Sequence, residues 1–248
     1  MSGRVALVTG GAGGIGTEIS RKLAQEGYRV VVTCAPVFEC PNLEEWKRLR
    51  KEEGMDIPVY EADVADFESC KAAVEQIERE VGPVEILVNC AGITRDSTLK
   101  RMTPQQWNEV IDTNLNSVFN MTKQVFTGMT DRGYGRIVNI SSINGRKGQF
   151  GQANYSAAKA GMHGFTMAIA QEGVSKGVTV NTISPGYIGT EMVKKIPEEV
   201  LKKIVAQIPV GRLGKPEEIA RVVAFLVHEE SAFITGANID INGGQFIH

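Results

Sequence analysis

The chain has 248 residues, of which 42% are hydrophobic and 23% charged, a composition typical of a globular protein large enough for one α/β domain. Its net charge of −2 lacks the basic excess that nucleic-acid binding requires, and its apolar runs are shorter than the ~20 residues that span a bilayer. The N-terminus passes directly into a strand pattern without a signal peptide, so we expect a cytoplasmic protein that binds neither nucleic acid nor membrane.

Short β-branched runs alternate with helical patterns along the whole chain. The predicted strands are residues 4–9, 29–33, 58–63, 85–89, 135–141, 178–184 and 237–241. The predicted helices are residues 17–27, 42–53, 66–81, 104–131, 155–176 and one that opens at Lys215; Asp66 caps the third, and a Thr103–Gln106 capping box precedes the fourth. This alternation predicts an α/β fold in which residues 1–248 form a single domain, a doubly wound parallel sheet of the Rossmann type with helices on both faces.

Glycines crowd the connection between the first strand and the first helix. Gly10, Gly14 and Gly16 fall in the run TGGAGGIG. Glycine lets the backbone approach a phosphate closely, and a helix N-terminus offers free N–H groups and partial positive charge. The run therefore predicts a pyrophosphate site for a dinucleotide. It is not a P-loop, because the Gly-Lys-Ser/Thr element is missing.

A second group of polar residues follows the fifth strand. Tyr155 and Lys159 stand four apart at the start of a predicted helix, and Ser142 ends the preceding strand pattern. Residues i and i+4 share a helix face. A nearby ammonium favours the phenolate, so we expect Lys159 to lower the pKa of Tyr155 from its usual value near ~10. A tyrosine tuned in this way could give a proton to a substrate oxygen, although such pairs also arise by chance on helices.

These motifs together resemble the short-chain dehydrogenase/reductase family over essentially the whole chain. The glycine run, the Asn89-Cys-Ala-Gly92 stretch, Asn114 and the Tyr155–Lys159 pair carry the resemblance. The family usually has a second asparagine where this chain has Cys90, so we expect a local change in loop packing there.

The resemblance implies a role for each matching residue. It implies that Tyr155 is the proton donor, that Ser142 polarises the substrate carbonyl, that Lys159 bonds the nicotinamide ribose, and that Asn114 positions a water linked to Lys159. The implied cofactor-binding residues are Gly10, Gly14, Ile15 and Gly16 for the pyrophosphate, Asp63 and Val64 for adenine, Asn89, Ala91 and Gly92 along the cleft, Tyr155 and Lys159, and Pro185, Gly186, Ile188 and Thr190 for the nicotinamide. Read alone, Asn114 could instead bend a helix and Asp63 could cap one.

The choice between NADH and NADPH depends on the end of the second strand. Residues 33–43 contain neither the acid typical of NAD enzymes at that strand end nor the basic residue that a 2′-phosphate requires, and Glu39 is their one charged residue. The residues therefore favour NADH, whereas reductases of this family most often use NADPH. The four cysteines, Cys34, Cys40, Cys70 and Cys90, include no C-x-x-C pair, so we expect no metal site and free thiols, although Cys34 and Cys40 could reach each other in a loop.

Further stretches around the site resemble reductases of β-keto thioesters within the family. They are most similar to acetoacetyl-CoA reductases of polyhydroxyalkanoate (polyhydroxybutyrate) synthesis, which form (R)-3-hydroxybutanoyl-CoA. The next most similar group is the 3-oxoacyl-(acyl-carrier-protein) reductases of fatty acid synthesis. We expect Gln149, Phe150, Gln152 and Tyr187 to wall the substrate, although the glutamines could simply be loop polarity. Basic residues that could meet CoA phosphates or an acidic carrier protein, or could simply be solvated, are Arg95, Lys100, Arg101, Arg146 and Lys147.

Residues 187–210 form a long excursion, which we predict to be a substrate lid. The resemblance also implies a homotetramer that pairs the helices at 104–131 and 155–176, and His163 on the second of these is predicted to pack only.

Two rival functions stay open. One is a non-catalytic dinucleotide sensor, which would tend to lose the Asn-Ser-Tyr-Lys set, and the other is a dehydrogenase of sugar or steroid alcohols.

Overall fold

Parallel strand pairing organises the molecule. The computed structural model describes residues 3–35, 43–190, 193 and 197–247, and within these ranges seven strands form one sheet in the order β3-β2-β1-β4-β5-β6-β7. The strands are β1 Val5–Thr9, β2 Arg29–Cys34, β3 Val59–Glu61, β4 Val84–Asn89, β5 Gly135–Ile140, β6 Val178–Pro185 and β7 Asn238–Ile241. All neighbours are parallel, and the order reverses direction at β1, which makes the sheet doubly wound as predicted.

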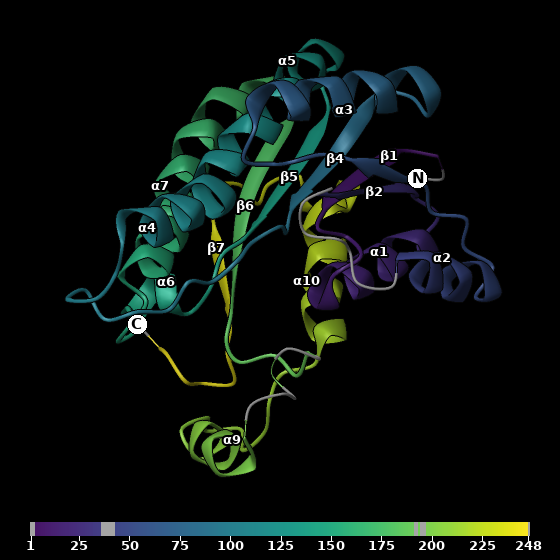
Figure 1. Ribbon diagram of the computed structural model, residues 1–248. Helices are drawn as coiled ribbons and strands as arrows, with labels where there is room; N and C mark the ends of the chain where they lie inside the picture. Colours follow the sequence, from purple (N-terminus) through teal and green to yellow (C-terminus); the bar gives the residue numbers. More distant parts are fainter. Residues whose placement is uncertain (1–2, 36–42, 191–192, 194–196, 248) are drawn as a thin grey trace.

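Helices cover both faces of the sheet, and α1 and α10 pack together on one face (Figure 1). The described helices are α1 Gly14–Gln25, α2 Leu43–Glu52, α3 Phe67–Glu80, α4 Pro104–Ile111, α5 Ser117–Arg132, α6 Asn144–Lys147, α7 Ala153–Gly173, α9 Glu198–Val205 and α10 Pro216–Val227. The opposite face carries α3, α5 and α7. The predicted caps are confirmed: Ser69 N donates to Asp66 Oδ1 over 2.6 Å, and Thr103 and Gln106 form the capping box.

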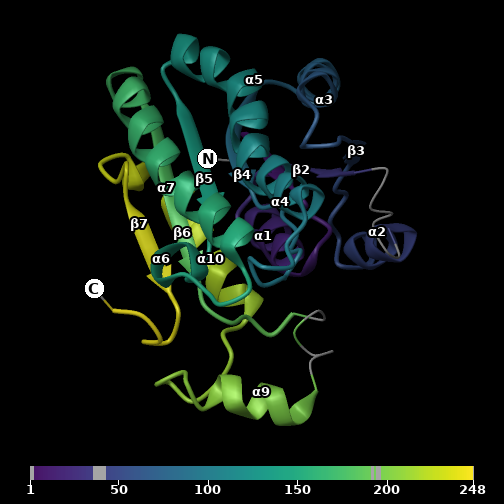
Figure 2. The same cartoon turned by 60° about the vertical axis from the view of Figure 1, so that its left-hand side comes forward.

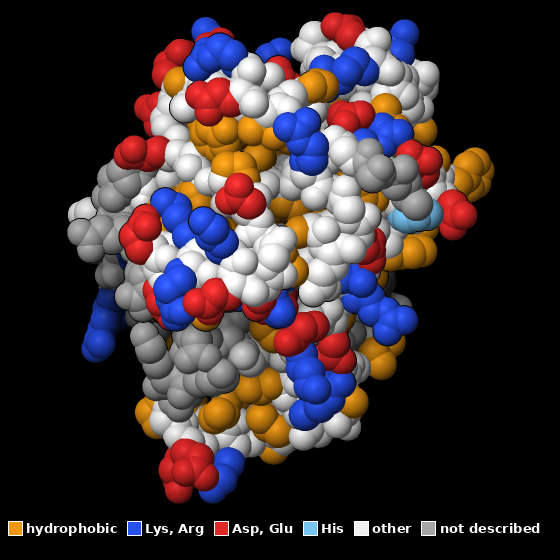
Figure 3. All heavy atoms as spheres, turned by 90° about the vertical axis from the view of Figure 1, so that its right-hand side faces the viewer, with side chains coloured by type: hydrophobic (Ala, Val, Ile, Leu, Met, Phe, Trp, Pro, Cys, Tyr) orange, Lys and Arg blue, Asp and Glu red, His pale blue; other side chains and the backbone are white. Residues whose placement is uncertain are grey.

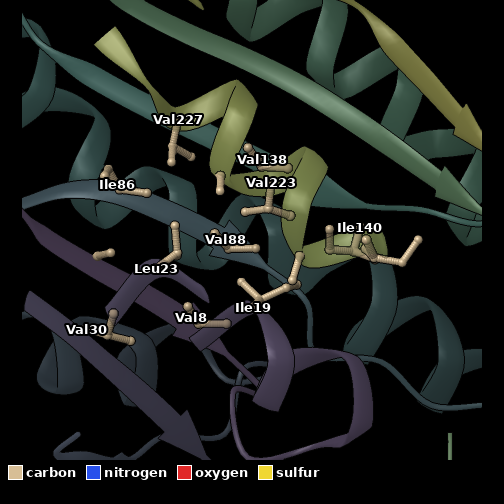
Figure 4. Packing of buried hydrophobic residues seen from close by; sticks show 14 of the residues in the cluster. Val8, Ile19, Leu23, Val30, Ile86, Val88, Val138, Ile140, Val223 and Val227 are labelled. Carbon is tan, nitrogen blue, oxygen red and sulfur yellow. The ribbon is translucent and has the colours of Figure 1, made fainter. Parts of the chain in front are cut away.

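Strand side chains alternate between two apolar clusters, one on each face. Val8, Val88 and Val138 point toward α1 and α10, where they meet residues such as Ile19 and Val223 (Figure 4). The residues one position earlier in the same strands belong to the other cluster, beneath α3 and α5. A strand that is buried on both faces reads as a continuous apolar run, which explains why the strand predictions succeeded.

The helix predicted over 104–131 is interrupted. A π-helical turn, Asp112–Asn116, separates α4 from α5. The helix predicted over 155–176 begins earlier, at Ala153, and gives way after Gly173 to a 3₁₀ turn, Val174–Lys176. The short helix α6 had no counterpart in the prediction.

The helix α9 lies beyond the carboxyl end of the sheet and apart from the other helices (Figures 1 and 2). Charged side chains of both signs are interspersed over the face that carries α1 and α2 (Figure 3), which agrees with the small net charge. Among the described residues, no helix is long and apolar enough to cross a membrane.

Candidate active site

The glycine loop is shaped by close backbone approaches. Gly10 has a φ of +62°, and its carbonyl oxygen accepts from Gly13 N over 3.0 Å. A Cβ on Gly16 would overlap that carbonyl oxygen, and a Cβ on Gly14 would lie 2.9 Å from Thr190 Cγ2. The helix α1 begins here with Gly13 as its N-cap, whose lack of a side chain leaves the first N–H groups uncovered. The loop therefore fits a dinucleotide pyrophosphate.

The turn after β3 carries the residues predicted to meet adenine. The Asp63 carboxylate accepts from Ala65 N over 3.0 Å, and the Val64 carbonyl accepts from Asn120 Nδ2 over 3.0 Å. The Asp63 side chain is thus used to hold its own turn, which fixes the position of the backbone at the carboxyl end of β3. This is the local helix-entry role that Asp63 could have alone, and a contact with adenine stays a prediction.

The end of β2 differs from expectation at one residue. Cys34 is disulfide-bonded, so the expectation of free thiols is wrong there, whereas Cys70 and Cys90 are free. Disulfide formation depends on Cα separation, which sequence spacing does not fix. Glu39 and Cys40 lie outside the described residues.

The connection after β4 is held from the neighbouring strand. Thr9 Oγ1 accepts from both Cys90 N and Ala91 N, over 3.0 and 3.1 Å. The Asn89 side chain donates to Asn139 Oδ1 over 2.8 Å inside the sheet, so it connects two strand ends, and a contact of Asn89 with the cofactor stays a prediction. The Cys90 side chain packs against the α1–α10 cluster, and burial raises the pKa of its thiol to about 11.

Asn114 lies in the π-helical turn and is fully buried. Its amide makes two hydrogen bonds to one residue: Asn114 Nδ2 donates to the Ile93 carbonyl and Ile93 N donates to Asn114 Oδ1, both over 2.8 Å. The side chain therefore fixes the segment that leaves Gly92, and the role of Asn114 in positioning a water stays a prediction. A Cβ on Gly92 would lie 3.2 Å from Asn114 Oδ1 and 3.5 Å from Lys159 Nζ, so the three residues are close.

Ser142, Tyr155 and Lys159 are brought together as predicted. The Ser142 hydroxyl lies close enough to the Tyr155 phenol to act on its pKa, and Lys159 Nζ lies 5.6 Å from the centre of the Tyr155 ring. Lys159 Nζ donates to the Ile140 carbonyl over 2.8 Å, so the ammonium is anchored on the end of β5. A hydroxyl, a phenol and an ammonium thus converge where β5 ends and α7 begins.

Burial dominates the ionisation of this group. It raises the pKa of Tyr155 to about 12, with the neighbouring Ser142 hydroxyl opposing and the Asp96 charge adding to the rise. This direction is opposite to the one expected from the Tyr155–Lys159 pairing. Burial also lowers the pKa of Lys159 to about 8. Both shifts have the same cause, because a low-dielectric site disfavours the charged form of each group. A phenol that stays protonated at neutral pH is the form that can donate a proton.

Two asparagines that the sequence did not single out support the site, Asn154 at Tyr155 and Asn144 at Ser142. The Asn154 side chain is fully buried; its Oδ1 accepts from Tyr155 N over 2.8 Å and its Nδ2 donates to the Arg95 carbonyl over 3.1 Å. Asn144 N donates to Ser142 Oγ over 3.1 Å. Asn154 is the second residue of α7 and does not cap the helix, so no capping signal in the sequence could have identified it.

The predicted substrate wall divides in two. Gln152 is engaged within the protein, because its Nε2 donates to Asp96 Oδ2 over 2.9 Å and its Oε1 accepts from Asn144 Nδ2 over 2.8 Å. Phe150 is 88% exposed, and Gln149 accepts from Lys147 Nζ at the surface. Both polar atoms of the Gln152 amide are thus bonded within the protein, and a contact of Gln152 with substrate stays a prediction. Asp96 is a residue that the sequence did not single out.

Tyr187 lies on the same side of the site as Asp96. Burial raises the pKa of its phenol, and the Asp96 charge adds to the rise. The neighbouring residues are fixed by the sheet, since the Pro185 carbonyl accepts from Ile143 N and Gly186 N donates to the Ile241 carbonyl, both over 2.8 Å. Ile188 is buried, and Thr190 approaches Gly14, so this segment borders the glycine loop.

Two of the basic residues considered for CoA phosphates have protein partners. Arg95 pairs with Glu109 over 2.6 Å, and Arg146 pairs with Asp240 over 3.5 Å. Lys100 and Arg101 lie at the exposed surface. Within the described ranges, no cluster of three or more His, Cys, Asp or Glu residues could hold a metal ion.

Comparison with known proteins agrees with this geometry. The profile of the short chain dehydrogenase family matches residues 4–201. The chain is 58% identical over 245 residues to the acetoacetyl-CoA reductase of Allochromatium vinosum, covering 99% of each chain, and 59% identical over 244 residues to that of Cupriavidus necator, covering 98% of each. It is 43% identical over 247 residues to the 3-oxoacyl-(acyl-carrier-protein) reductase of Pseudomonas aeruginosa, covering 100% of this chain and 99% of that one.

Proposed function

The chain belongs to the short-chain dehydrogenase family, and from that premise we propose that it reduces acetoacetyl-CoA to (R)-3-hydroxybutanoyl-CoA with a nicotinamide dinucleotide. The observation that carries the substrate is the full-length likeness to proteins named acetoacetyl-CoA reductase. The product suits a reaction that polymerises 3-hydroxyacyl thioesters, and polyhydroxybutyrate synthesis is the setting that we propose.

The residues of the site divide the work of a carbonyl reduction. The dinucleotide, when bound over the glycine loop and the Pro185–Thr190 segment, supplies the hydride. Ser142 donates a hydrogen bond to the keto oxygen, and Tyr155 gives that oxygen its phenolic proton as negative charge develops there. The Lys159 ammonium, 5.6 Å from the Tyr155 ring centre, stabilises the phenolate that remains. Aligning these groups on one oxygen removes much of the entropic barrier.

A second candidate is reduction of a 3-oxoacyl thioester on an acyl carrier protein. The 43% identity to the Pseudomonas aeruginosa reductase favours it, and the chemistry at the keto carbon is the same. A non-catalytic sensor is a distant third candidate, since all four residues of the Asn-Ser-Tyr-Lys set are retained.

The deciding experiment follows dinucleotide absorbance at 340 nm with acetoacetyl-CoA, an acetoacetyl carrier-protein thioester and a simple ketone in parallel. We expect the highest kcat/KM with acetoacetyl-CoA. A higher kcat/KM with the carrier-protein thioester would favour the second candidate, and turnover of the ketone alone would overturn both.

For the dinucleotide we propose NADH, because residues 33–43 contain no basic residue to meet a 2′-phosphate. The family preference for NADPH is the alternative. The measurement is kcat/KM with each dinucleotide under identical conditions, and a preference for NADPH of tenfold or more would overturn the choice.

We propose that residues 187–210 act as a lid. The first residue of this segment is anchored, since Gly214 N donates to the Tyr187 carbonyl over 2.9 Å, and residues 191–192 and 194–196 within it lie outside the described residues. By contrast, the described residues of α9 are all at least partly exposed, and Val200 is 47% exposed. Segments with few buried contacts open at low cost. Amide hydrogen exchange in α9 should slow when dinucleotide and substrate are both present, and unchanged exchange would contradict closure.

We also propose a cytoplasmic homotetramer. The helices α5 and α7 leave large apolar side chains exposed in the single chain, with Phe119 50%, Met167 52% and Val174 49% exposed nearby. Such surface is typical of contacts between subunits. Light scattering should give four times the chain mass, and a monomer would contradict the proposal.

A further inference from the structure

A continuous series of hydrogen bonds lies behind the candidate site. Ser141 Oγ donates to the Lys159 carbonyl over 2.8 Å, and His163 Nε2 lies 3.0 Å from that same Ser141 Oγ. His163 Nε2 also lies 3.3 Å from Ser184 Oγ, which in turn donates to Asn238 Oδ1 over 2.6 Å. The series therefore joins the ends of β5 and β6 and the start of β7 to the catalytic turn of α7.

The far end of this series is fixed by an ion pair. Asn238 Nδ2 donates to Asp240 Oδ1 over 3.1 Å, and Asp240 pairs with Arg146 over 3.5 Å. A carboxylate only accepts hydrogen bonds, so the nitrogen of the Asn238 amide must face Asp240 and its oxygen must face Ser184. The orientation of the amide is thus determined by its partners.

The protons on the two serines are then assigned. The Lys159 carbonyl can only accept, so Ser141 donates its one hydroxyl proton there. The Asn238 oxygen can only accept, so Ser184 donates its proton there. Neither serine has a proton left for His163, and the contacts at 3.0 and 3.3 Å must be filled by a proton on His163 Nε2. His163 is therefore a shared donor to two serine oxygens.

We propose that His163, as its Nε2–H tautomer, is a positioning residue that locks the strand end bearing Ser142 to the helical turn bearing Lys159. The inference rests on the proposed function, in which those two residues act together. Ser141 is the residue directly before Ser142, and the backbone N–H of His163 belongs to the same helical turn as the Lys159 carbonyl. The three groups thus close a ring that couples the two catalytic elements.

The surroundings keep the ring in this state. Ser184 is fully buried and Ser141 is 4% exposed, so both hydroxyls depend on protein partners. Burial lowers the pKa of His163, with the Arg146 charge adding to the fall and Asp240 opposing it, which favours a neutral imidazole at pH 7. Without the His163 donor the two serine oxygens would each lose a partner, and the Ser141–Lys159 contact would relax.

Two substitutions separate positioning from packing. His163→Gln keeps an N–H donor at about the reach of Nε2, whereas His163→Leu fills the space without a donor. We expect kcat of H163L to fall by roughly 10- to 100-fold, the cost of a small misplacement in a site, with the dinucleotide Kd unchanged. H163Q should recover kcat to within about threefold of the wild type. Equal loss in both variants would assign His163 to packing and overturn the inference.

A measurement on the unaltered protein guards against variants that fail to fold. Long-range ¹H–¹⁵N NMR correlations of the histidine rings distinguish the tautomers, and His163 should be neutral and protonated on Nε2 at pH 7. A proton on Nδ1 alone would overturn the assignment. Ser141→Ala should lower kcat as H163L does, and the double variant should add little to either, because both remove the same ring.

The positioning role of His163 and the proposed reaction can fail separately. Loss of turnover in Tyr155→Phe together with full turnover in H163L would sink the positioning role while leaving the reaction intact. Retained turnover in Tyr155→Phe would sink the reaction itself, whereas the NMR tautomer would still report on the ring.

Discussion

The glycine loop and the tyrosine pocket, which we define as Ser142, Tyr155 and Lys159, face the same edge of the sheet but are built in opposite ways. In the loop, a Cβ on Gly16 would overlap the Gly10 carbonyl oxygen, so dinucleotide binding depends on the absence of side chains. In the pocket, Ser142, Tyr155 and Lys159 each contact a named partner, so function depends on atoms that are present. The loop should therefore be sensitive to added atoms, and the pocket to removed ones.

Removing one oxygen from the pocket gives the largest expected effect. Tyr155→Phe keeps the ring and its packing but deletes the proton donor, so kcat should fall by about 10²- to 10⁴-fold. The dinucleotide Kd should stay at the wild-type value in a fluorescence titration.

Tyr134→Phe is the matched control. Tyr134 is a partly exposed residue near Arg4 and Arg136, remote from the site, and within the described part of the chain its buried hydroxyl oxygen has no hydrogen-bond partner. It should retain full turnover. Turnover in Y155F comparable with that in Y134F would remove the tyrosine from the mechanism.

Adding one carbon to the loop tests the other half of the comparison. Gly16→Ala forces the Gly10 backbone to move, at a strain of roughly 1–3 kcal/mol, so the dinucleotide should bind about 10- to 100-fold more weakly. Gly13→Ala is the milder change, because its Cβ would lie 3.2 Å from the same oxygen. Equal affinities in G16A and the wild type, measured by calorimetry, would show that the loop does not hold the dinucleotide.

The pocket should also cost stability where it buries charge. The pKa of Lys159 is lowered to about 8 by burial, from 10.5, and the side chain is 4% exposed. Below pH 8 the folded protein carries the full cost of burying the Lys159 charge, roughly 3 kcal/mol. Between pH 8 and 10.5 the free energy of unfolding rises, because the unfolded chain binds more protons than the folded protein does.

Lys159→Met removes that cost, although it also removes the hydrogen bond to the Ile140 carbonyl, which offsets about 1 kcal/mol. The free energy of unfolding at pH 7 should therefore be higher in K159M by about 2 kcal/mol. Urea unfolding across pH 7 to 10.5 measures the difference, which should shrink as the pH rises. A variant less stable than the wild type at every pH would contradict this account of the pocket.

The sequence predicted best what local patterns encode. The apolar strands, the Asp66 cap, the Thr103–Gln106 capping box and the Tyr155–Lys159 spacing all depend on residues within a few positions of one another. Such patterns can be read without the fold, because helix and strand periodicity and capping hydrogen bonds involve residues that are close in sequence.

What the sequence did not predict depends on long-range partners. The π-helical turn at Asp112–Asn116 accompanies the bonding of Asn114 to Ile93, which is 21 positions away in sequence. Gln152 reads as a free substrate-binding amide until its bond to Asp96, 56 positions away, is seen. The ionisation of Tyr155 was misjudged for a similar reason, since burial is a property of the whole fold and outweighed the neighbouring charge.

The smallest expected effect concerns the hydrogen bond between Gln152 and Asp96. Exchanging the donor and the acceptor between these two residues should be tolerated, whereas losing the donor should not. Gln152→Glu replaces a donor with a carboxylate oxygen that faces Asp96 Oδ2 at the present 2.9 Å spacing, so kcat/KM for acetoacetyl-CoA should fall by about tenfold. Gln149→Glu is the control, because its oxygen already accepts from Lys147 Nζ and the new charge is attractive there. Adding Asp96→Asn to Q152E exchanges donor and acceptor across the same gap and should restore most of the lost kcat/KM. If the double variant stays as slow as Q152E, the Asp96 carboxylate acts on the substrate itself, and the hydrogen bond is not what orients the loop.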